Sequence, residues 1–158
     1  MAISLGRRSG GAIVSRRRIT FGLVATLALS SSACTAAVVS KPILDTRTSE
    51  GGQVTVTVTW DGPSAGPRFG VTMDTHAVDL DAYDLSTLAV LRVDGGREAQ
   101  PDGWDAPKGG HHRKGNLSFA TTTADGKPLI NQTTRSVELI IRDVAGVSER
   151  RFRWDLSS

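Results

Sequence analysis

The chain has 158 residues, with 19 Lys or Arg and 16 Asp or Glu, which gives a formal net charge of +3. Five of the arginines lie in the first 18 residues, and without them 14 basic and 16 acidic residues remain, a net charge of −2. The basic character therefore belongs to the N-terminal segment. The remaining chain lacks the positive charge that nucleic acids attract, so we expect no nucleic-acid partner.

Residues 1–33 predict a cleaved signal peptide. Arginines come first, an apolar run follows over 19–29, and small residues lead up to Cys34; this is the order of a secretory signal. The apolar run is about half of the roughly 20 residues that span a bilayer, which argues against a permanent transmembrane helix. Arg16, Arg17 and Arg18 resemble the twin-arginine export motif, which would place the protein outside the cytoplasm by export in a folded state.

Cys34 resembles the acylated cysteine of bacterial lipoproteins. It follows Ser32 and Ala33, although Ser31 stands where such signals have a large aliphatic residue. We therefore expect a lipid anchor in the cell membrane at Cys34, with simple cleavage and secretion as the alternative. Because Cys34 is the only cysteine, no disulfide is expected. Residues 34–51 mix small, polar and proline residues without a period, which predicts a flexible, lipid-anchored linker.

From residue 52 the chain reads as β-structure. Val54, Val56, Val58 and Trp60 alternate with threonines, a pattern typical of a strand with one buried face. Similar segments follow, separated by turn residues and without a long amphipathic helix. Residues 52–157 therefore predict an all-β domain, an immunoglobulin-like antiparallel β-sandwich of six to seven strands. The predicted strands cover residues 53–60, 68–77, 87–93, 97–100, 116–121, 136–143 and 149–156.

The three histidines suggest a site. His76 lies at the end of the second predicted strand, and His111 and His112 precede the fifth. In an immunoglobulin-like topology these two strands pair antiparallel, which would gather the histidines at one edge. Imidazole and carboxylate groups bind zinc or Cu(II). The candidate metal ligands are His76, His111, His112, Asp74 and Asp79.

Other interpretations of the same residues stay open. Histidines at a strand edge also anchor loops by hydrogen bonds, or they bind another ligand. Residues 79–84 lack the glycine and terminal glutamate of a calcium loop, and a blue-copper site requires a thiolate. No nucleophile elbow, phosphate loop or dinucleotide motif occurs, so no catalytic residue is nominated. Arg150, Arg151 and Arg153 are expected on a solvated strand face.

Three segments carry a resemblance to a family: MDTHAVDLDAYDL, WDAPKGGHHRKGNLSF and ERRFRWDL. They resemble a group of uncharacterised exported prokaryotic domains with a DTH-x-VDLD segment and a later GGHHR-x-G segment. The resemblance implies an extracytoplasmic β-sandwich-like domain behind a signal peptide or membrane anchor, and it implies no activity. It nominates these motif positions: Asp74, Thr75, His76, Asp79, Asp81, His111, His112 and Arg113. Among them, Thr75, Asp81 and Arg113 suit a hydrogen-bond network that joins two loops.

These observations predict a non-enzymatic binding or accessory module anchored at the cell envelope, with a histidine cluster that binds zinc or copper. The alternative is a structural or protein-interaction domain whose His/Asp motif only locks loops, with an envelope protein as partner. A metal-assisted hydrolase is a further, weaker alternative.

Overall fold

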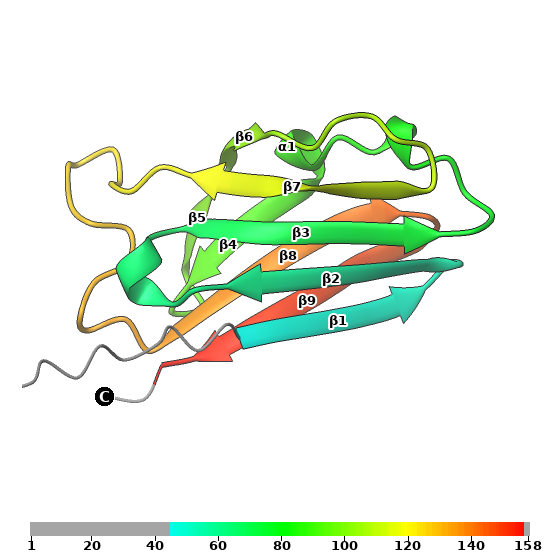
Figure 1. Ribbon diagram of the computed structural model, residues 1–158. Helices are drawn as coiled ribbons and strands as arrows, with labels where there is room; N and C mark the ends of the chain where they lie inside the picture. The colour runs from blue at the N-terminus through cyan, green and yellow to red at the C-terminus, as the bar shows by residue number, and fades with distance from the viewer. Residues whose placement is uncertain (1–44, 157–158) are drawn as a thin grey trace, which may run out of the picture. The chain divides into compact units, whose positions relative to one another are not determined.

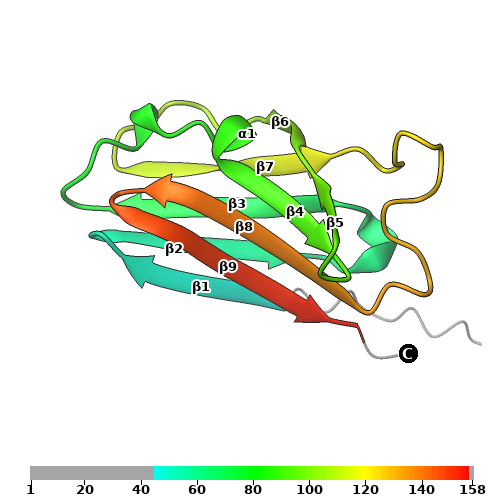
Figure 2. The same ribbon diagram turned by 180° about the vertical axis from the view of Figure 1, so that it is seen from behind.

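The computed structural model describes residues 45–156, which form two antiparallel sheets packed face to face (Figures 1 and 2). The predicted signal peptide, Cys34 and residues 34–44 of the predicted linker lie outside the described residues. Short helical turns connect some of the strands: η1 (Pro63–Ala65), η2 (Leu80–Ala82) and α1 (Leu85–Leu88). The described part contains nine strands: β1 (Asp45–Gly51), β2 (Val54–Trp60), β3 (Arg68–Thr75), β4 (Ala89–Val93), β5 (Arg97–Ala99), β6 (Pro101–Trp104), β7 (His112–Phe119), β8 (Ser136–Val144) and β9 (Val147–Asp155).

The strand order confirms the predicted all-β sandwich. One sheet has the order β1-β2-β3-β7-β6, and the other has the order β5-β4-β8-β9. The rows β2-β3-β7-β6 and β5-β4-β8-β9 follow the immunoglobulin strand order, and β1 is an added strand beside β2. The pairing of β3 with β7, on which the position of the histidines depends, is present.

The alternation seen in the sequence builds the core between the sheets. In β2 the four residues Val54, Val56, Val58 and Trp60 are each at most 2% exposed, and the threonines between them face outward. The ring centroid of Trp60 lies 5.6 Å from those of Phe69 and Trp154, within the range of favourable aromatic pairs. The indole of Trp60 donates to the carbonyl of Gly66 at 2.9 Å. Large aromatic residues from both sheets thus meet in the core.

Residues 45–51 correct the predicted domain boundary. They were expected to belong to a flexible linker, but they form β1, which pairs with β2 over its whole length. The segment has no apolar alternation because β1 is an edge strand with mostly exposed residues. Its threonines pair instead with those of β2, and the Oγ1 atoms of Thr46 and Thr59 lie 3.0 Å apart. β6 was also not predicted, and β7 begins at His112 rather than near residue 116.

Side chains join the outer edges of β1 and β9, which lie side by side (Figures 1 and 2). The indole of Trp154 donates to the carbonyl of Asp45 at 3.2 Å. Arg150, expected in solvent, is 1% exposed and donates to the carbonyls of Ser49 and Gly51 at 3.1 and 2.6 Å. Arg150 is in phase with Phe152 and Trp154, the other buried residues of β9, whereas Arg151 and Arg153 are exposed. The acceptors for its buried guanidinium come from β1.

Within residues 45–156 no helix has the length and apolar character needed to cross a membrane.

Candidate functional site

The antiparallel pairing of β3 and β7 assembles the motif residues at one end of the five-stranded sheet. Asp74 stands opposite His112 in the register. One residue further, the amide of Thr75 donates to the carbonyl of His111 at 3.0 Å, which extends the ladder beyond β7. The segments around residues 74–84 and 105–113 therefore meet, as the topology predicted.

Three of the five candidate metal ligands lie together on the solvent side of this edge. The Nδ1 atom of His112 is 2.8 Å from Oδ1 of Asp74, and both side chains are well exposed. The rings of His76 and His112 have centroids 6.3 Å apart and are nearly perpendicular. Asp74 and His76 also line a shallow pocket of about 290 Å³. Among the described residues, however, no three His, Cys, Asp or Glu side chains are arranged to hold one metal ion.

The other two candidate ligands have different roles. Nδ1 of His111 lies 3.0 Å from the carbonyl of Val78, and because a carbonyl only accepts, this nitrogen carries the proton. The carboxylate of Asp79 accepts the amide of Asp81 at 3.0 Å and caps η2. Both side chains thus hold the segment that follows β3. The five residues divide into an exposed Asp74, His76, His112 group and two loop anchors.

Thr75 fixes the point where the chain leaves β3. It is 4% exposed, and its hydroxyl donates to the carbonyl of Gln53 at 2.6 Å. The same oxygen accepts the amide of Ala77 at 3.2 Å. Thr75 therefore joins the turn before β2 to the turn after β3.

Arg113 is the centre of the network below the histidines. It is 5% exposed, and its guanidinium lies 5.8 Å from the ring centroid of Trp104. It donates to backbone carbonyls on both sides of the edge. Buried carbonyls need hydrogen-bond donors, and one planar guanidinium supplies several in a fixed geometry. The acceptors are the carbonyls of Leu80 at 2.9 Å, Tyr83 at 2.7 Å, Ala106 at 3.2 Å and Pro107 at 3.2 Å.

Asp81 joins the same two segments from the opposite direction. Its Oδ1 accepts the amides of Gly109 and Gly110 at 2.9 and 3.3 Å and lies 3.9 Å from Nε of Arg113. The hydrogen bond from Gly109 is the main cause that lowers the pKa of Asp81, with Gly110 and the charge of Arg113 acting in the same direction. The backbone adds a further link, because the amide of Leu80 donates to the carbonyl of Gly110 at 2.9 Å. Asp81 and Arg113 therefore each contact the backbone of the opposite segment, whereas Thr75 contacts the turns before β2 and after β3.

Two contributors to this edge were not predicted. Gly115 in β7 faces the backbone of Ala106, and a Cβ atom at residue 115 would overlap it. Asp105 accepts the amide of Asn116, and this bond is the first cause that lowers the pKa of Asp105. An isolated glycine inside a strand pattern is a signal of close backbone approach, but only the packing shows which segment approaches.

No family model, curated protein or solved structure matches this chain.

Proposed function

We propose that the chain is a non-enzymatic binding or accessory module of the cell envelope, anchored by a lipid on Cys34, in which the two motif segments lock the loop edge of the sandwich. The observation that carries the proposal is the buried guanidinium of Arg113. It donates to four carbonyls from two loops that are more than 20 residues apart in sequence. A side chain that donates all these hydrogen bonds within the fold holds the two loops together, which supports the role of a rigid scaffold.

The neighbouring motif residues support the same role. Asp79, Asp81 and His111 all direct a polar side-chain atom to the backbone. An edge that is held from both sides keeps its exposed groups in a constant arrangement, and preorganised groups bind a partner at lower entropic cost. The partner class that suits this arrangement is another protein of the envelope.

Metal binding by the exposed histidines is the second candidate function. It is favoured by the contact of His112 with Asp74 and by the nearby ring of His76. A carboxylate that holds one nitrogen of a histidine commonly orients the other nitrogen toward a metal. Small rotations of exposed side chains would be needed to direct both imidazoles at one zinc or Cu(II) ion.

Calorimetric titration separates the two functions. Purified protein without residues 1–33 is titrated with Zn²⁺ and with Cu²⁺, beside His76→Ala and His112→Ala. His111→Ala is the matched control, because His111 is bonded to Val78 and lies outside the exposed group. Binding at one site that is lost in the first two variants and kept in the control would establish the metal function. Absence of binding would leave the lock as the role of the motif.

The lock itself is tested by stability. If Arg113→Met unfolds at the same denaturant concentration as the native protein, the proposed lock is wrong.

The anchor is tested separately by metabolic labelling with a fatty-acid analogue in a bacterial host, beside Cys34→Ala. Label on the native chain alone supports anchoring, and an unlabelled native chain contradicts it.

A further inference from the structure

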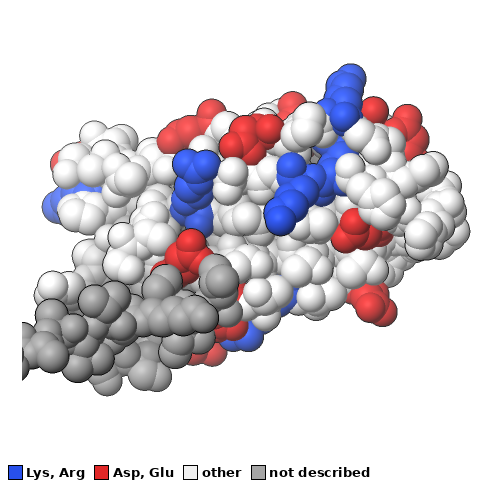
Figure 3. Space-filling model, viewed as in Figure 1, with Lys and Arg blue, Asp and Glu red and all other residues white. Residues whose placement is uncertain are grey.

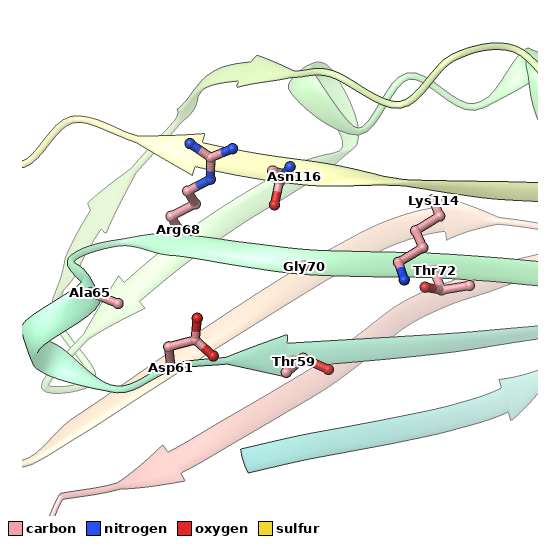
Figure 4. Close-up of a pocket in the computed structure, with 8 residues that line it drawn as sticks. All are labelled: Thr59, Asp61, Ala65, Arg68, Gly70, Thr72, Lys114 and Asn116. Atoms are coloured by element: carbon pink, nitrogen blue, oxygen red, sulfur yellow. The ribbon is translucent and has the colours of Figure 1, made fainter. Parts of the chain in front are cut away.

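A polar groove runs over the outer face of the five-stranded sheet, beside the motif edge. It has a volume of about 340 Å³ and crosses β2, β3 and β7 (Figure 4). Gly70 lies in the middle of its floor, between Thr59 on β2 and Asn116 on β7. Figure 3 shows Lys and Arg side chains standing on the part of this face that lies over β3 and β7.

Gly70 has no structural reason to be glycine. It is in the central strand of its sheet, its φ is not in the left-handed region, and an added Cβ would meet only the Thr59 carbonyl, at 3.9 Å. Glycine within a strand lowers stability, and it often marks a place where another molecule approaches closely. The contrast is Gly115, where a Cβ would overlap Ala106. The missing side chain at residue 70 is what opens the groove.

The groove has a cation on each side of Gly70. Arg68 and Lys114 both line it and are exposed, and Figure 4 shows their charged groups on opposite sides of the glycine. Arg68 has only a long contact of 3.8 Å with Asp105. Lys114 forms no ion pair with any residue between 45 and 156. Lys114 is therefore free to take up an anion, and Arg68 can do so by giving up its long contact with Asp105.

Neutral polar groups fill the space between the cations. Thr59 and Thr72 supply hydroxyls. The side-chain amide nitrogen of Asn116 donates to Asp105 at 3.1 Å, and its oxygen points toward Gly70 (Figure 4). On the rim, the carboxylate of Asp61 adds a further acceptor. No aromatic residue lines the groove, so a neutral sugar ring would find no surface on which to stack.

We propose that this groove binds a small polyhydroxylated acid, a sugar-like molecule that carries a carboxylate or a phosphate group. The acid group lies against Arg68 and Lys114, and the hydroxyls exchange hydrogen bonds with Thr59, Thr72 and Asn116. A charged group bound by charged donors is the strongest contact available there. This site adjoins the exposed pair of Asp74 and His112 in the register of β3 and β7, but it adds a ligand class to the module without depending on the lock or on a metal.

The test is a titration followed by the backbone amide signals in ¹H–¹⁵N NMR spectra. Glucuronate and glucose 6-phosphate are the probes, and neutral glucose is the control. The expected result is a saturable shift of the Gly70, Thr72 and Asn116 amides with one or both acids, weaker at high salt, and none with glucose. A response to glucuronate alone identifies a carboxylate ligand, and one to glucose 6-phosphate alone identifies a phosphate ligand.

Two variants test whether residues of the groove are responsible for the binding. Lys114→Gln is expected to weaken binding about tenfold, since it removes a charged donor. Gly70→Val fills the groove and should abolish binding in a fold at least as stable as the native one, because valine favours strands. Thr48→Val, on the same face outside the groove, is the control for both. The proposal is overturned if neither acid shifts these amides, if the shifts lie elsewhere, or if Gly70→Val binds as the native protein does.

Discussion

His112 and Asp74 are 38 residues apart in the chain, yet Nδ1 of the histidine lies 2.8 Å from Oδ1 of the aspartate. They are direct neighbours in the register of β3 and β7, so the contact exists only when these two strands have paired. Below this exposed pair, Arg113 holds the same two chain segments from inside the fold. The exposed pair and the buried arginine are therefore expected to contribute differently to the stability of the fold.

Asp74→Ala should have a small effect. Both partners of the His112 contact are more than a third exposed, and exposed pairs contribute at most about 1 kcal/mol. We expect the free energy of unfolding in urea to fall by less than about 1 kcal/mol. A larger loss would mean that the exposed pair, and not the buried network, holds the edge.

Arg113→Met should be strongly destabilising. Methionine fills much of the space but donates to none of the four carbonyls, and a buried unsatisfied polar group costs about 1–3 kcal/mol. A loss of about 3 kcal/mol or more is expected, a large share of the roughly 5–15 kcal/mol that stabilises a typical domain. Arg153→Met, at an arginine whose side chain is 51% exposed, is the matched control and should change the unfolding free energy by no more than about 0.5 kcal/mol.

Asp81 should make the stability of the fold depend on pH in the acidic range. Hydrogen bonds from Gly109 and Gly110 lower the pKa of Asp81 in the folded state below the ordinary value of 3.8. Its stabilising effect is therefore complete above pH 3.8 and is lost as the pH falls through the folded-state pKa. Unfolding midpoints of the native protein and Asp81→Asn should differ at neutral pH and converge in acid. Asp102→Asn, at an exposed position, should show no such convergence, and parallel curves for Asp81→Asn would refute the mechanism.

Arg150→Met should loosen β1 in particular. The guanidinium is buried and bonded to the carbonyls of Ser49 and Gly51, and burial lowers its pKa. We expect a loss of about 2 kcal/mol and faster hydrogen exchange at amides of β1 than at those of β8. Arg151→Met, at the adjacent and largely exposed arginine, should leave exchange in β1 unchanged. Equal acceleration in every strand would show that Arg150 acts on the whole fold instead.

The change in stability caused by Gly115→Ala should differ in sign or size from the change caused by Gly70→Ala, although both glycines lie within strands. The first places a methyl group on the backbone of Ala106, and the second places it in an open groove. Overpacking typically costs about 1–3 kcal/mol, whereas alanine in place of a strand glycine gains roughly 0.5–1 kcal/mol. Thermal unfolding of the two variants measures the difference. Similar midpoints would contradict the close contact at residue 115.

The sequence predicted the elements whose two faces differ. β2 alternates valine with threonine because one face is buried and the other is exposed, and that pattern can be recognised without a structure. β1 has no such contrast, since its residues are mostly exposed, so it was mistaken for a linker. β6 is short and its register with β7 shifts near Gly103, which leaves too little pattern to identify.

The sequence indicated where in the fold the candidate residues lie, but not which side-chain contacts they form. Topology alone placed His76 and His112 at one edge, because strand order determines which strand ends meet. Whether a side chain turns outward to solvent or toward a carbonyl depends on loop geometry, which is why His111 could not be distinguished from His112. The burial of Arg150 is in phase with the alternation of β9. What the sequence of β9 does not show is that carbonyls of β1 accept from this arginine and make its burial possible.

The joined edges of β1 and β9 restrict how another protein could attach. On that side, side chains of one strand occupy backbone groups of the other, and on the opposite side β5 has three residues and β6 has four. The carbonyls of Asp45, Ser49, Gly51 and Arg153 are already occupied, and β5 and β6 are short. Addition of a partner's strand, a common route of peptide recognition and of fibril growth through sheets, is therefore disfavoured. A partner would therefore have to recognise the pattern of side chains on the sheet faces or loops, and molecules at high concentration would remain separate.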